Sequence, residues 1–400
     1  MSSQQYLRIG TDYFKKVEVP LNSGDHYKTL FKWKKSEIVT DEGKNALKII
    51  PKYDGFCLIP SHTEYKSIIN NFYNKYEEID HKLQKGSFVK TERFLTHIFG
   101  NQLILGLDYL TILWRYPNNM LPILCLVSEK RKTGKTTFLN WLKLIFQGNM
   151  TINKNEDFRS RFNADWSTKL IIAVDEVLLD KKEDSERIKN LSTANSYKTE
   201  SKGIDKNESE FFGKFILCSN NESSFIYVDK DEIRYWVIQV PELSDDNEKP
   251  DLLNDLKKEI PYFLEYINKR EIVSQKKTRM WFTKEQIHTK ALDRLVTGNR
   301  TYLNSELEEI LIDQFIKYDF EILKYSLSDL VELLNKNNVR VSSSKVSELL
   351  KNHYKMESKN GMYDKYSQSF INNDEVMINT EKCKGRYFTF EKKMFLTNEC

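Results

Sequence analysis

The chain has 400 residues, of which 40% are hydrophobic and 30% are charged. That composition excludes a disordered chain and allows a sizeable core, and the length suggests about two or three domains. The 62 basic and 58 acidic residues leave a net charge of +4, which excludes a histone-like polycation but leaves local basic surfaces open.

The cysteines and the apolar runs bear on the cellular compartment. The five cysteines are widely scattered and odd in number, so they give neither a disulfide framework nor the close spacing of a zinc site. The first residues lack the apolar core of a signal peptide, and no apolar run approaches the roughly 20 residues of a membrane span. We therefore expect a cytoplasmic protein without a membrane partner.

The first 116 residues divide into two regions by their residue pattern. Residues 1–61 have the pattern of a mixed α/β region of unclear role, with strand-like apolar runs at 46–50 and 55–59. Residues 62–116 have the pattern of a helical region, in which apolar groups at helical spacing predict one helix over 65–73. One interpretation of the helical region is a cap on the sheet that follows.

An apolar run at 121–127, a short loop and an amphipathic run at 138–146 predict a buried strand, a turn and a helix. Four residues open that helix and are candidate nucleotide-binding residues: Gly134, Lys135, Thr136 and Thr137. This is the layout of a P-loop, whose backbone N–H groups bind nucleotide phosphates. Lys135 would reach the β- and γ-phosphates of ATP, and Thr136 would place its hydroxyl on Mg²⁺. Glu129 stands where the usual pattern has glycine, and the alternative is an ordinary strand–turn–helix corner.

A second buried strand is predicted at 170–174, directly before Asp175 and Glu176. Five apolar residues that end in two acids are typical of a Walker B strand. On a parallel strand beside the P-loop strand, Asp175 would hold Mg²⁺, directly or through water, and Glu176 would polarise the attacking water. The alternative is a strand that ends in a charged turn.

The segment 188–206 follows that strand. Its first part has a helical pattern, and its second part is polar, contains Gly203 and repeats lysine at Lys198, Lys202 and Lys206. A hairpin with Lys202 and Gly203 at its tip would project a cation that grips DNA phosphates in a central channel. The alternative is a solvated polar loop.

Two further polar residues flank predicted strands. The run 214–221 ends in polar amides, where Asn220 could hydrogen-bond the γ-phosphate or the lytic water, or form an Asx turn instead. Arg234 opens the next apolar strand, and an arginine there can reach the γ-phosphate held by a neighbouring subunit. The alternative for Arg234 is a surface ion pair with Asp231 or Glu232.

A polar break at 241–250 separates this part from an amphipathic helix predicted at 252–270, which should pack back on the core. Residues 300–400 have the pattern of a separate small domain. Its predicted elements are a capped helix at 326–334, an extended stretch at 338–341, a helix that Ser343 or Ser344 caps and that runs to 350, and a strand at 385–390.

That order is compatible with a winged helix. The second helix would then be the recognition helix, with Ser344, Lys345 and Lys351 on or near the side that meets DNA. Many winged helices bind protein instead, so this alternative stays open.

Together these motifs resemble superfamily 3 helicases, and more closely the helicase part of phage and plasmid primase-helicases. The compact spacing from Lys135 to Asn220 is similar to the spacing in that family. The resemblance covers residues 90–285, where the stretches 94–100 and 107–110 resemble the helical approach to the P-loop. The long N-terminal primase-polymerase domain of full-length members is not expected in this chain, so neither is primer synthesis.

The resemblance implies an α/β fold whose ATPase core, at 117–285, is AAA+-like with a parallel central sheet. Residues 62–116 would be an oligomerisation collar, and 300–400 a winged-helix-like domain. The implied roles are P-loop for Gly134, Lys135 and Thr136, Walker B for Asp175 and Glu176, DNA-contacting hairpin for Lys202, sensor for Asn220 and arginine finger for Arg234.

The activity that the resemblance implies is ATP hydrolysis with Mg²⁺ by a DNA helicase of phage or mobile-element replication. It would work as a homo-hexameric ring on single-stranded or forked DNA in the bacterial cytoplasm, with a separate primase or polymerase as partner. One rival is a nucleotide-dependent initiator or loader, which shares every ATPase residue. Another is a DNA-binding adaptor with a degenerate ATPase core, for which Glu129 is the warning sign.

Overall fold

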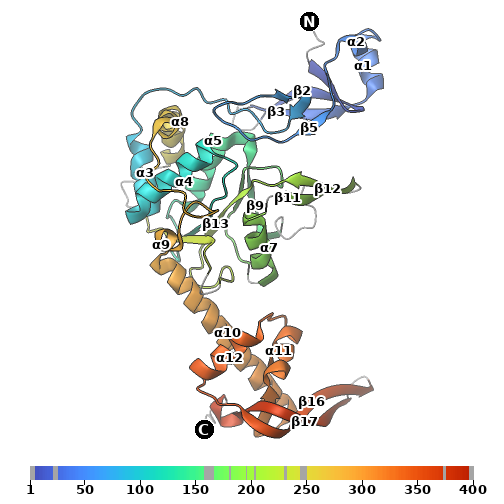
Figure 1. Ribbon diagram of the computed structural model, residues 1–400, viewed down its shortest axis with the longest axis vertical. Coiled ribbons are helices and arrows are strands. Elements are labelled where there is room, and N and C mark those ends of the chain that lie inside the picture. Colours follow the sequence, from blue (N-terminus) through green and yellow to red (C-terminus); the bar gives the residue numbers. More distant parts are fainter. Residues whose placement is uncertain are drawn as a thin grey trace. The chain divides into compact units, whose positions relative to one another are not determined.

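The computed structural model describes residues 5–20, 26–156, 166–179, 182–194, 196–201, 204–228, 232–243, 250–372 and 375–395. The chain forms two compact units (Figure 1). The larger unit takes residues 1–178, 186–222 and 231–292, and the smaller unit takes residues 179–185, 223–230 and 293–400. Within the described ranges, no helix is both long and apolar enough to span a membrane.

A sheet of five strands forms the centre of the larger unit (Figure 1). All neighbouring strands are parallel, in the order β14-β8-β13-β10-β9. Their bounds are Ile123–Val127 for β8, Met150–Asn153 for β9, Ile171–Val174 for β10, Lys214–Ser219 for β13 and Tyr235–Gln239 for β14. The predicted strands at 121–127, 170–174 and 214–221 are thereby confirmed as strands. Their continuous apolar character fits a parallel sheet, whose two faces are both covered.

The neighbours of β10 differ from the prediction. The Walker B strand was expected beside the P-loop strand, but β13 lies between β8 and β10. β13 pairs with β8 through Ile216 and Leu124, and with β10 through Phe215 and Ile172. Strand order could not be read from the residue pattern, because all buried parallel strands have the same apolar composition.

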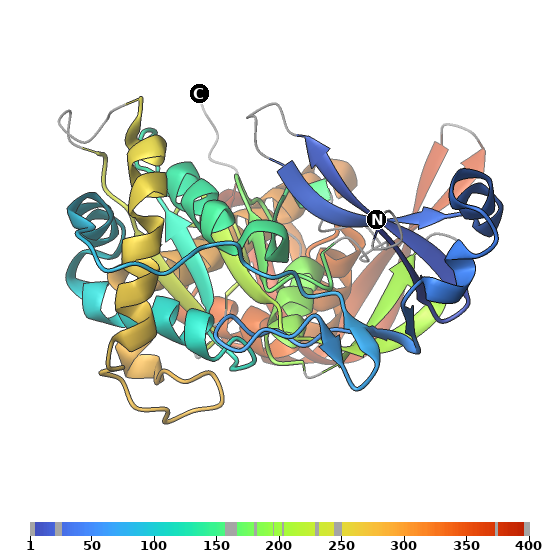
Figure 2. The ribbon, with the colours of Figure 1, turned by 90° about the horizontal axis from the view of Figure 1, so that it is seen from above.

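Four long helices pack with this sheet: α3 (Val89–Phe99), α4 (Leu103–Arg115), α5 (Lys135–Phe146) and α8 (Leu252–Lys269). α8 contacts the other three, as Figure 2 shows from above. Its buried face includes Phe263, whose ring centroid lies 5.2 Å from that of Trp141 on α5. The helix predicted at 252–270, with its packing back on the core, is confirmed.

A buried ion pair ties α4 to the end of α8. Asp108 pairs with Arg270, and the two side chains are only 1% and 8% exposed. The carboxylate of Asp108 also accepts the backbone N–H groups of Val273 at 3.2 Å and Ser274 at 2.7 Å. These added hydrogen bonds offset the cost of burying the charge, which an isolated carboxylate could not bear.

The N-terminal residues form a second sheet in the order β3-β2-β1-β4. The bounds are Tyr6–Ile9, Asp12–Pro20, His26–Trp33 and Lys52–Tyr53 for β1 to β4, with α1 at Lys35–Glu42 and α2 at Ala46–Ile49. The strand predicted over 46–50 is therefore wrong. Ala46, Leu47 and Lys48 all favour helix, and Ala46 packs with Tyr6 and Ile38 in a small core.

The helix predicted over 65–73 is also wrong. This segment holds two short strands, β6 (Ile68–Ile69) and β7 (Phe72–Asn74), and β7 pairs with β5 (Gly55–Cys57) as well. Asn70 and Asn71 adopt positive φ angles of 46° and 65°, which a helix does not allow. Asparagine tolerates this conformation better than other non-glycine residues, so the pair forms a tight turn.

A helix and a hairpin lie between β10 and β13 in the sequence. They are α7 (Lys182–Ser192), β11 (Ser196–Ser201) and β12 (Ile204–Glu210), and β11 and β12 pair antiparallel. The predicted helix and hairpin are confirmed, and the predicted tip residues Lys202 and Gly203 lie outside the described residues. One further short helix, α9, spans Lys284–Ile287.

The smaller unit has its own core. It contains most of α10 (Lys290–Tyr318), then β15 (Ile322–Ser326), α11 (Leu327–Lys336), α12 (Ser343–Asn352), β16 (Lys359–Asn372) and β17 (Glu375–Glu391). The strands form an antiparallel sheet in the order β15-β17-β16. Leu330 and Leu334 of α11, Leu350 of α12 and Phe390 of β17 are fully buried together.

The N-terminal caps of α11 and α12 agree with the sequence prediction in part. Ser326 caps α11 as predicted, because its hydroxyl accepts the N–H of Asp329 at 3.1 Å and the Asp329 carboxylate accepts the N–H of Ser326 at 3.0 Å. The second helix begins one residue early, so Ser342 holds the cap position expected for Ser343 or Ser344. The Ser342 hydroxyl lies 2.9 Å from that of Ser344.

Candidate functional site

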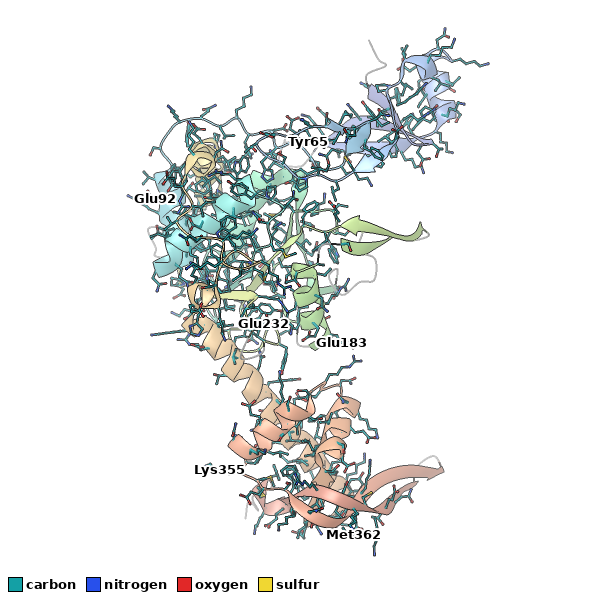
Figure 3. The ribbon with its side chains drawn as sticks, viewed as in Figure 1. Tyr65, Glu92, Glu183, Glu232, Lys355 and Met362 are labelled. Atoms are coloured by element: carbon teal, nitrogen blue, oxygen red, sulfur yellow. The ribbon has the colours of Figure 1, made fainter. Side chains whose placement is uncertain are left out.

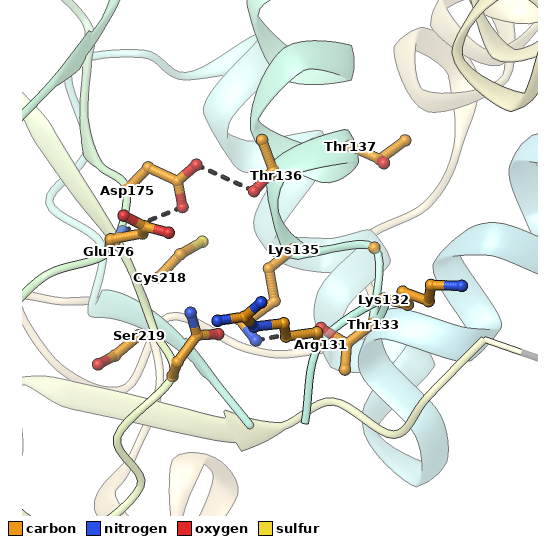
Figure 4. A pocket seen from close by; sticks show the side chains of 12 residues that line it. Arg131, Lys132, Thr133, Lys135, Thr136, Thr137, Asp175, Glu176, Cys218 and Ser219 are labelled. Carbon is orange, nitrogen blue, oxygen red and sulfur yellow. Dashed lines mark hydrogen bonds between the residues drawn. The ribbon is translucent and has the colours of Figure 1, made fainter. Parts of the chain in front are cut away.

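The carboxyl ends of β8, β10 and β13 meet at a pocket of about 490 Å³ (Figure 4). Parallel strands bring the loops that follow them to one edge of a sheet, which is where ligands bind in such folds. Seven residues proposed from the sequence line this pocket: Gly134, Lys135, Thr136, Thr137, Asp175, Glu176 and Asn220. The structure thus brings together residues from three separate segments.

The loop before α5 takes its left-handed backbone at Lys132 and Gly134, with φ angles of 57° and 85°. A Cβ atom at Gly134 would lie 3.1 Å from the ring of Phe94 on α3, so both conformation and space require glycine there. Glu129 does not adopt a left-handed φ, and its side chain is exposed. This loop therefore does not need a glycine at position 129.

Residues outside the loop hold it in place. The Glu222 carboxylate accepts the N–H of Glu129 at 3.2 Å and the side-chain amide of Gln239 at 2.9 Å. The N–H of Leu243 donates to the carbonyl of Lys132 at 3.0 Å, and His97 Nε2 donates to the carbonyl of Thr133 at 3.0 Å. Sequence analysis missed these contacts because they join segments whose spacing carries no motif.

Lys135 is the buried cation of the pocket. Its side chain points inward, with Nζ 3.1 Å from Thr133 Oγ1, and the residue is only 7% exposed. Burial lowers the pKa of Lys135, while Cys218, Asp175 and Glu222 act in the opposite direction. A cation at the first turn of α5, beside free backbone N–H groups, is suited to an anionic ligand.

Thr136 and Asp175 meet on the other side of the pocket. The Thr136 hydroxyl donates to the Asp175 carboxylate at 2.9 Å (Figure 4). A hydroxyl and a carboxylate are oxygen ligands of the kind that Mg²⁺ prefers. The adjacency of these two oxygens fits the bound cation that the sequence predicts.

Glu176 has a strained backbone, with a φ of 54°. Its N–H donates to the Asp175 carboxylate at 3.1 Å, and its carbonyl accepts from the Asn155 side chain at 3.2 Å. A left-handed non-glycine residue persists only where its surroundings hold it, and such residues gather at functional sites. Asn155 also accepts the N–H of Leu178 at 3.0 Å, so it fixes the turn that carries Glu176.

The end of β13 is anchored to the same turn. The Ser219 hydroxyl donates to the carbonyl of Val177 at 2.9 Å, and the N–H of Val177 donates to the carbonyl of Cys218 at 2.7 Å. Asn220 follows at the pocket, where its exposed amide forms no hydrogen bond with the described part of the chain. The alternative Asx turn is therefore not formed.

Arg131 is a pocket residue that sequence analysis missed. Its exposed guanidinium has no ion pair or hydrogen bond among the residues that the structure describes. The neighbouring Lys132 points away from Lys135 and Asp175, as Figure 4 shows. The only signal in the sequence was the run of three basic residues at 130–132.

Arg234 does not lie in this pocket. It precedes β14, whose carboxyl end, not its start, lies beside the end of β8. Its guanidinium is 3.5 Å from the carboxylate of Glu232, which also lies 3.7 Å from Lys189. The ion pair with Glu232 that the sequence left open is therefore present.

Two of the three candidate DNA-binding lysines lie on the strands of the hairpin. Lys198 is on β11, where it pairs with Glu208 in the backbone ladder, and Lys206 is on β12. Lys202 lies outside the described residues.

One family model matches the chain, over residues 126–234, and its description is a family of unknown function (DUF5906). The matched segment runs from β8 to Arg234 and so contains every residue proposed for the pocket. No curated protein matches the chain.

Solved structures are similar to the chain in fold. The apo structure of the NrS-1 C terminal region (305-718) gives a TM-score of 0.58 at 14% identity, and the match covers 96% of each chain. The A form apo structure of that region gives a TM-score of 0.55 at 18% identity, covering 84% of this chain and 81% of that chain. At these identities the likeness shows a shared fold and nothing further.

Proposed function

We propose that the chain is a P-loop ATPase of the superfamily 3 helicase type, which hydrolyses ATP and translocates on single-stranded DNA as a ring. The observation that carries this proposal is the meeting of Lys135, Thr136, Asp175, Glu176 and Asn220 in one pocket at the carboxyl edge of a parallel sheet. These residues come from three segments, and each has the side chain that phosphoryl transfer from ATP to water requires.

The loop and the first turn of α5 would bind the phosphates. Lys135 neutralises charge on the β- and γ-phosphates, and the N–H groups of Thr136 and Thr137 face the same anion. The Thr136 hydroxyl and the Asp175 carboxylate would hold Mg²⁺, which supplies charge neutralisation when bound. The geometry at Glu129 supports an active loop, because the missing glycine is not required there.

Glu176 and Asn220 would act on the water. The strained turn held by Asn155 keeps the Glu176 carboxylate at the pocket, where it polarises the water that attacks the γ-phosphate. The amide of Asn220, which has no hydrogen bond with the described part of the chain, lies at the same pocket and can hydrogen-bond that water or the γ-phosphate.

Arg234 would act on a neighbouring subunit. It sits at the start of β14, about 16 Å of strand away from the edge that carries the chain's own pocket. An arginine so placed cannot serve its own site but suits an interface, as in a homo-hexameric ring. If Arg234 broke its ion pair with Glu232, its guanidinium could bind a phosphate held by the neighbouring subunit.

The DNA would be single-stranded or forked, and the β11–β12 hairpin would move it. Lys198, Lys202 and Lys206 are the candidate phosphate contacts on that hairpin. The elements of the smaller unit fit a winged helix, and a replication role with a separate primase or polymerase in a bacterial host belongs to the same proposal.

The test is ATP hydrolysis by the full chain with and without single-stranded DNA, beside Lys135→Ala and Lys130→Ala. Lys130 is a matched lysine of the same loop, but it is exposed and paired with Glu242 at 2.7 Å. We expect hydrolysis that rises with DNA, disappears in Lys135→Ala and persists in Lys130→Ala.

Other outcomes separate the rivals. DNA-stimulated hydrolysis without unwinding of a fork would favour an initiator or loader. An absence of hydrolysis by the wild type under assembling conditions would overturn the ATPase proposal and favour a DNA-binding adaptor.

A further inference from the structure

The β16–β17 hairpin of the smaller unit is longer than its sheet requires. β15 pairs with β17 only over Tyr387–Glu391, whereas β16 pairs with β17 from Tyr387 outward to Glu375. The outer part is therefore a two-stranded ribbon without a third strand. Such a ribbon is at best marginally stable by itself, so its length indicates a role beyond completing the core.

Three cations line one face of this ribbon. Lys382, Lys384 and Arg386 alternate along β17, so their side chains share a face, and all three are exposed. None of them forms an ion pair or hydrogen bond through its side chain with the described part of the chain. Their cross-strand neighbours on β16 are Asp364, Met362 and Asn360. We call these three cations and their three neighbours, Asp364 included, the ribbon face.

Several other cations of the smaller unit are engaged with carboxylates. Lys365 lies 2.9 Å from Asp329, and Lys336 lies 2.9 Å from Glu332. Surface cations with such partners have part of their charge neutralised. Lys382, Lys384 and Arg386 lie within a short stretch of strand, where Asp364 across from Lys382 leaves a net charge of +2 (three cations and one carboxylate).

One cation of the helix expected to meet DNA, and one just before that helix, are engaged as well. Lys345 of α12 lies 3.9 Å above the ring of Tyr227, a cation–π contact inside the smaller unit. Arg340, in the stretch before α12, pairs with Glu183 of the same unit. A ligand would have to displace these partners, whereas the side chains of Lys382, Lys384 and Arg386 have none among the described residues.

We propose that the ribbon face binds the phosphate backbone of nucleic acid, independently of nucleotide hydrolysis. A row of unpaired lysine and arginine side chains is the chemistry that recognises phosphates. A two-stranded ribbon also has the width that the major groove of a duplex admits. Met362 is 55% exposed between the cations and offers an apolar contact (Figure 3).

The experiment compares two triple variants of the full chain, each of which removes three positive charges from the smaller unit. The first is Lys382→Gln, Lys384→Gln and Arg386→Gln. The matched control is Lys317→Gln, Lys355→Gln and Lys359→Gln, at exposed positions off the ribbon face that have no side-chain partner in the described part of the chain. The probes are a short DNA duplex and a single strand of the same sequence, titrated without ATP over a salt series.

We expect only the ribbon variant to lose salt-dependent affinity. Three lost phosphate contacts reduce the slope of log affinity against log salt by about 2.7 on duplex or about 2.1 on single strand. Between about 50 and 200 mM salt, the advantage of the wild type over the ribbon variant should then shrink about 40-fold or about 20-fold. The probe that shows the larger change identifies the form of nucleic acid.

Equal losses in both triple variants would overturn the proposal in favour of net charge, and so would no loss in either. Weaker binding of polyglutamate with unchanged DNA binding would instead point to an acidic protein partner. The variant Lys382→Arg with Lys384→Arg keeps the charge and should bind as the wild type, which separates loss of charge from loss of folding. ATP hydrolysis without DNA should be unchanged in all of these variants. A failure of the ribbon proposal can therefore be distinguished from a failure of the ATPase proposal.

Discussion

Thr136 and Asp175 are 39 residues apart in the sequence, yet the hydroxyl of one donates to the carboxylate of the other at 2.9 Å. If these oxygens hold Mg²⁺, Asp175→Asn should reduce the rate constant of ATP hydrolysis about 100-fold or more, because an amide does not neutralise the cation. Steady-state hydrolysis at saturating ATP measures this. Glu92→Gln, on the exposed face of α3, is the control and should leave the rate unchanged.

Gly134 and Gly43 can both be replaced by alanine, one in the loop of the pocket and the other far from it in the sequence. Their φ angles are 85° and 78°, so alanine strains both by about 1–2 kcal/mol. Gly134→Ala should also lower nucleotide affinity about tenfold, because its Cβ would press against Phe94 and shift the loop. Gly43 has no atom within 4 Å of a built Cβ, so Gly43→Ala should affect only unfolding. Equal affinities in the two variants would contradict the loop geometry.

Arg131 and Lys132 are adjacent cations that differ in direction. Arg131 lines the pocket and has no partner among the described residues, and Lys132 points away from Lys135 (Figure 4). We expect Arg131→Ala to lower ATP affinity by at least about tenfold, through loss of one charged hydrogen bond, and Lys132→Ala to lower it much less. Fluorescent nucleotide titration measures both, and a larger effect of Lys132→Ala would show that Arg131 does not contact the nucleotide.

Lys214 makes stability depend on pH. Its ammonium group is fully buried against the carbonyls of Pro117 and Phe212, and burial lowers its pKa to about 7. The unfolded chain keeps the ordinary pKa near 10.5, so between the two values it binds more protons than the folded chain. The free energy of unfolding should therefore rise with pH across that window.

The measurement is urea unfolding at two pH values, about 7.5 and 9. Over this interval the wild type should gain about 2 kcal/mol from Lys214 that Lys214→Met does not gain. Subtracting the free energy of unfolding of the variant from that of the wild type cancels the contributions of groups that titrate in both proteins. A constant difference would show that Lys214 stays protonated in the folded state.

Local patterns predicted four of the five strands of the central sheet, β8, β10, β13 and β14, and the helices α5 and α8. These elements follow from apolar runs or periodicity, and the cap of α11 at Ser326 fits the cap-like serine or aspartate of the predicted helix. The failures at 46–50 and 65–73 have local causes too. A short apolar run does not distinguish helix from strand, and the φ of Asn70 and Asn71 breaks a pattern that spacing alone makes helical.

The pocket was predictable only where residues follow a strand. Lys135, Asp175 and Asn220 could be found because parallel strands deliver their carboxyl ends to one edge. Glu222 and Asn155 could not, since each acts on a backbone group of another segment. The order of β8, β13 and β10 could not be predicted either, because strand pairing depends on packing in three dimensions.

β14 connects Arg234 to the loop of the pocket. At its start stands Arg234, and just past its end Leu243 donates to the carbonyl of Lys132 in the loop. Between them the strand is paired with β8 along its whole length, from Tyr235 to Gln239. A force applied to Arg234 from outside the chain would therefore act along β14, which its hydrogen bonds to β8 keep extended. A displacement of Arg234 would in this way be transmitted along one strand to Leu243 and to the loop that holds Lys132.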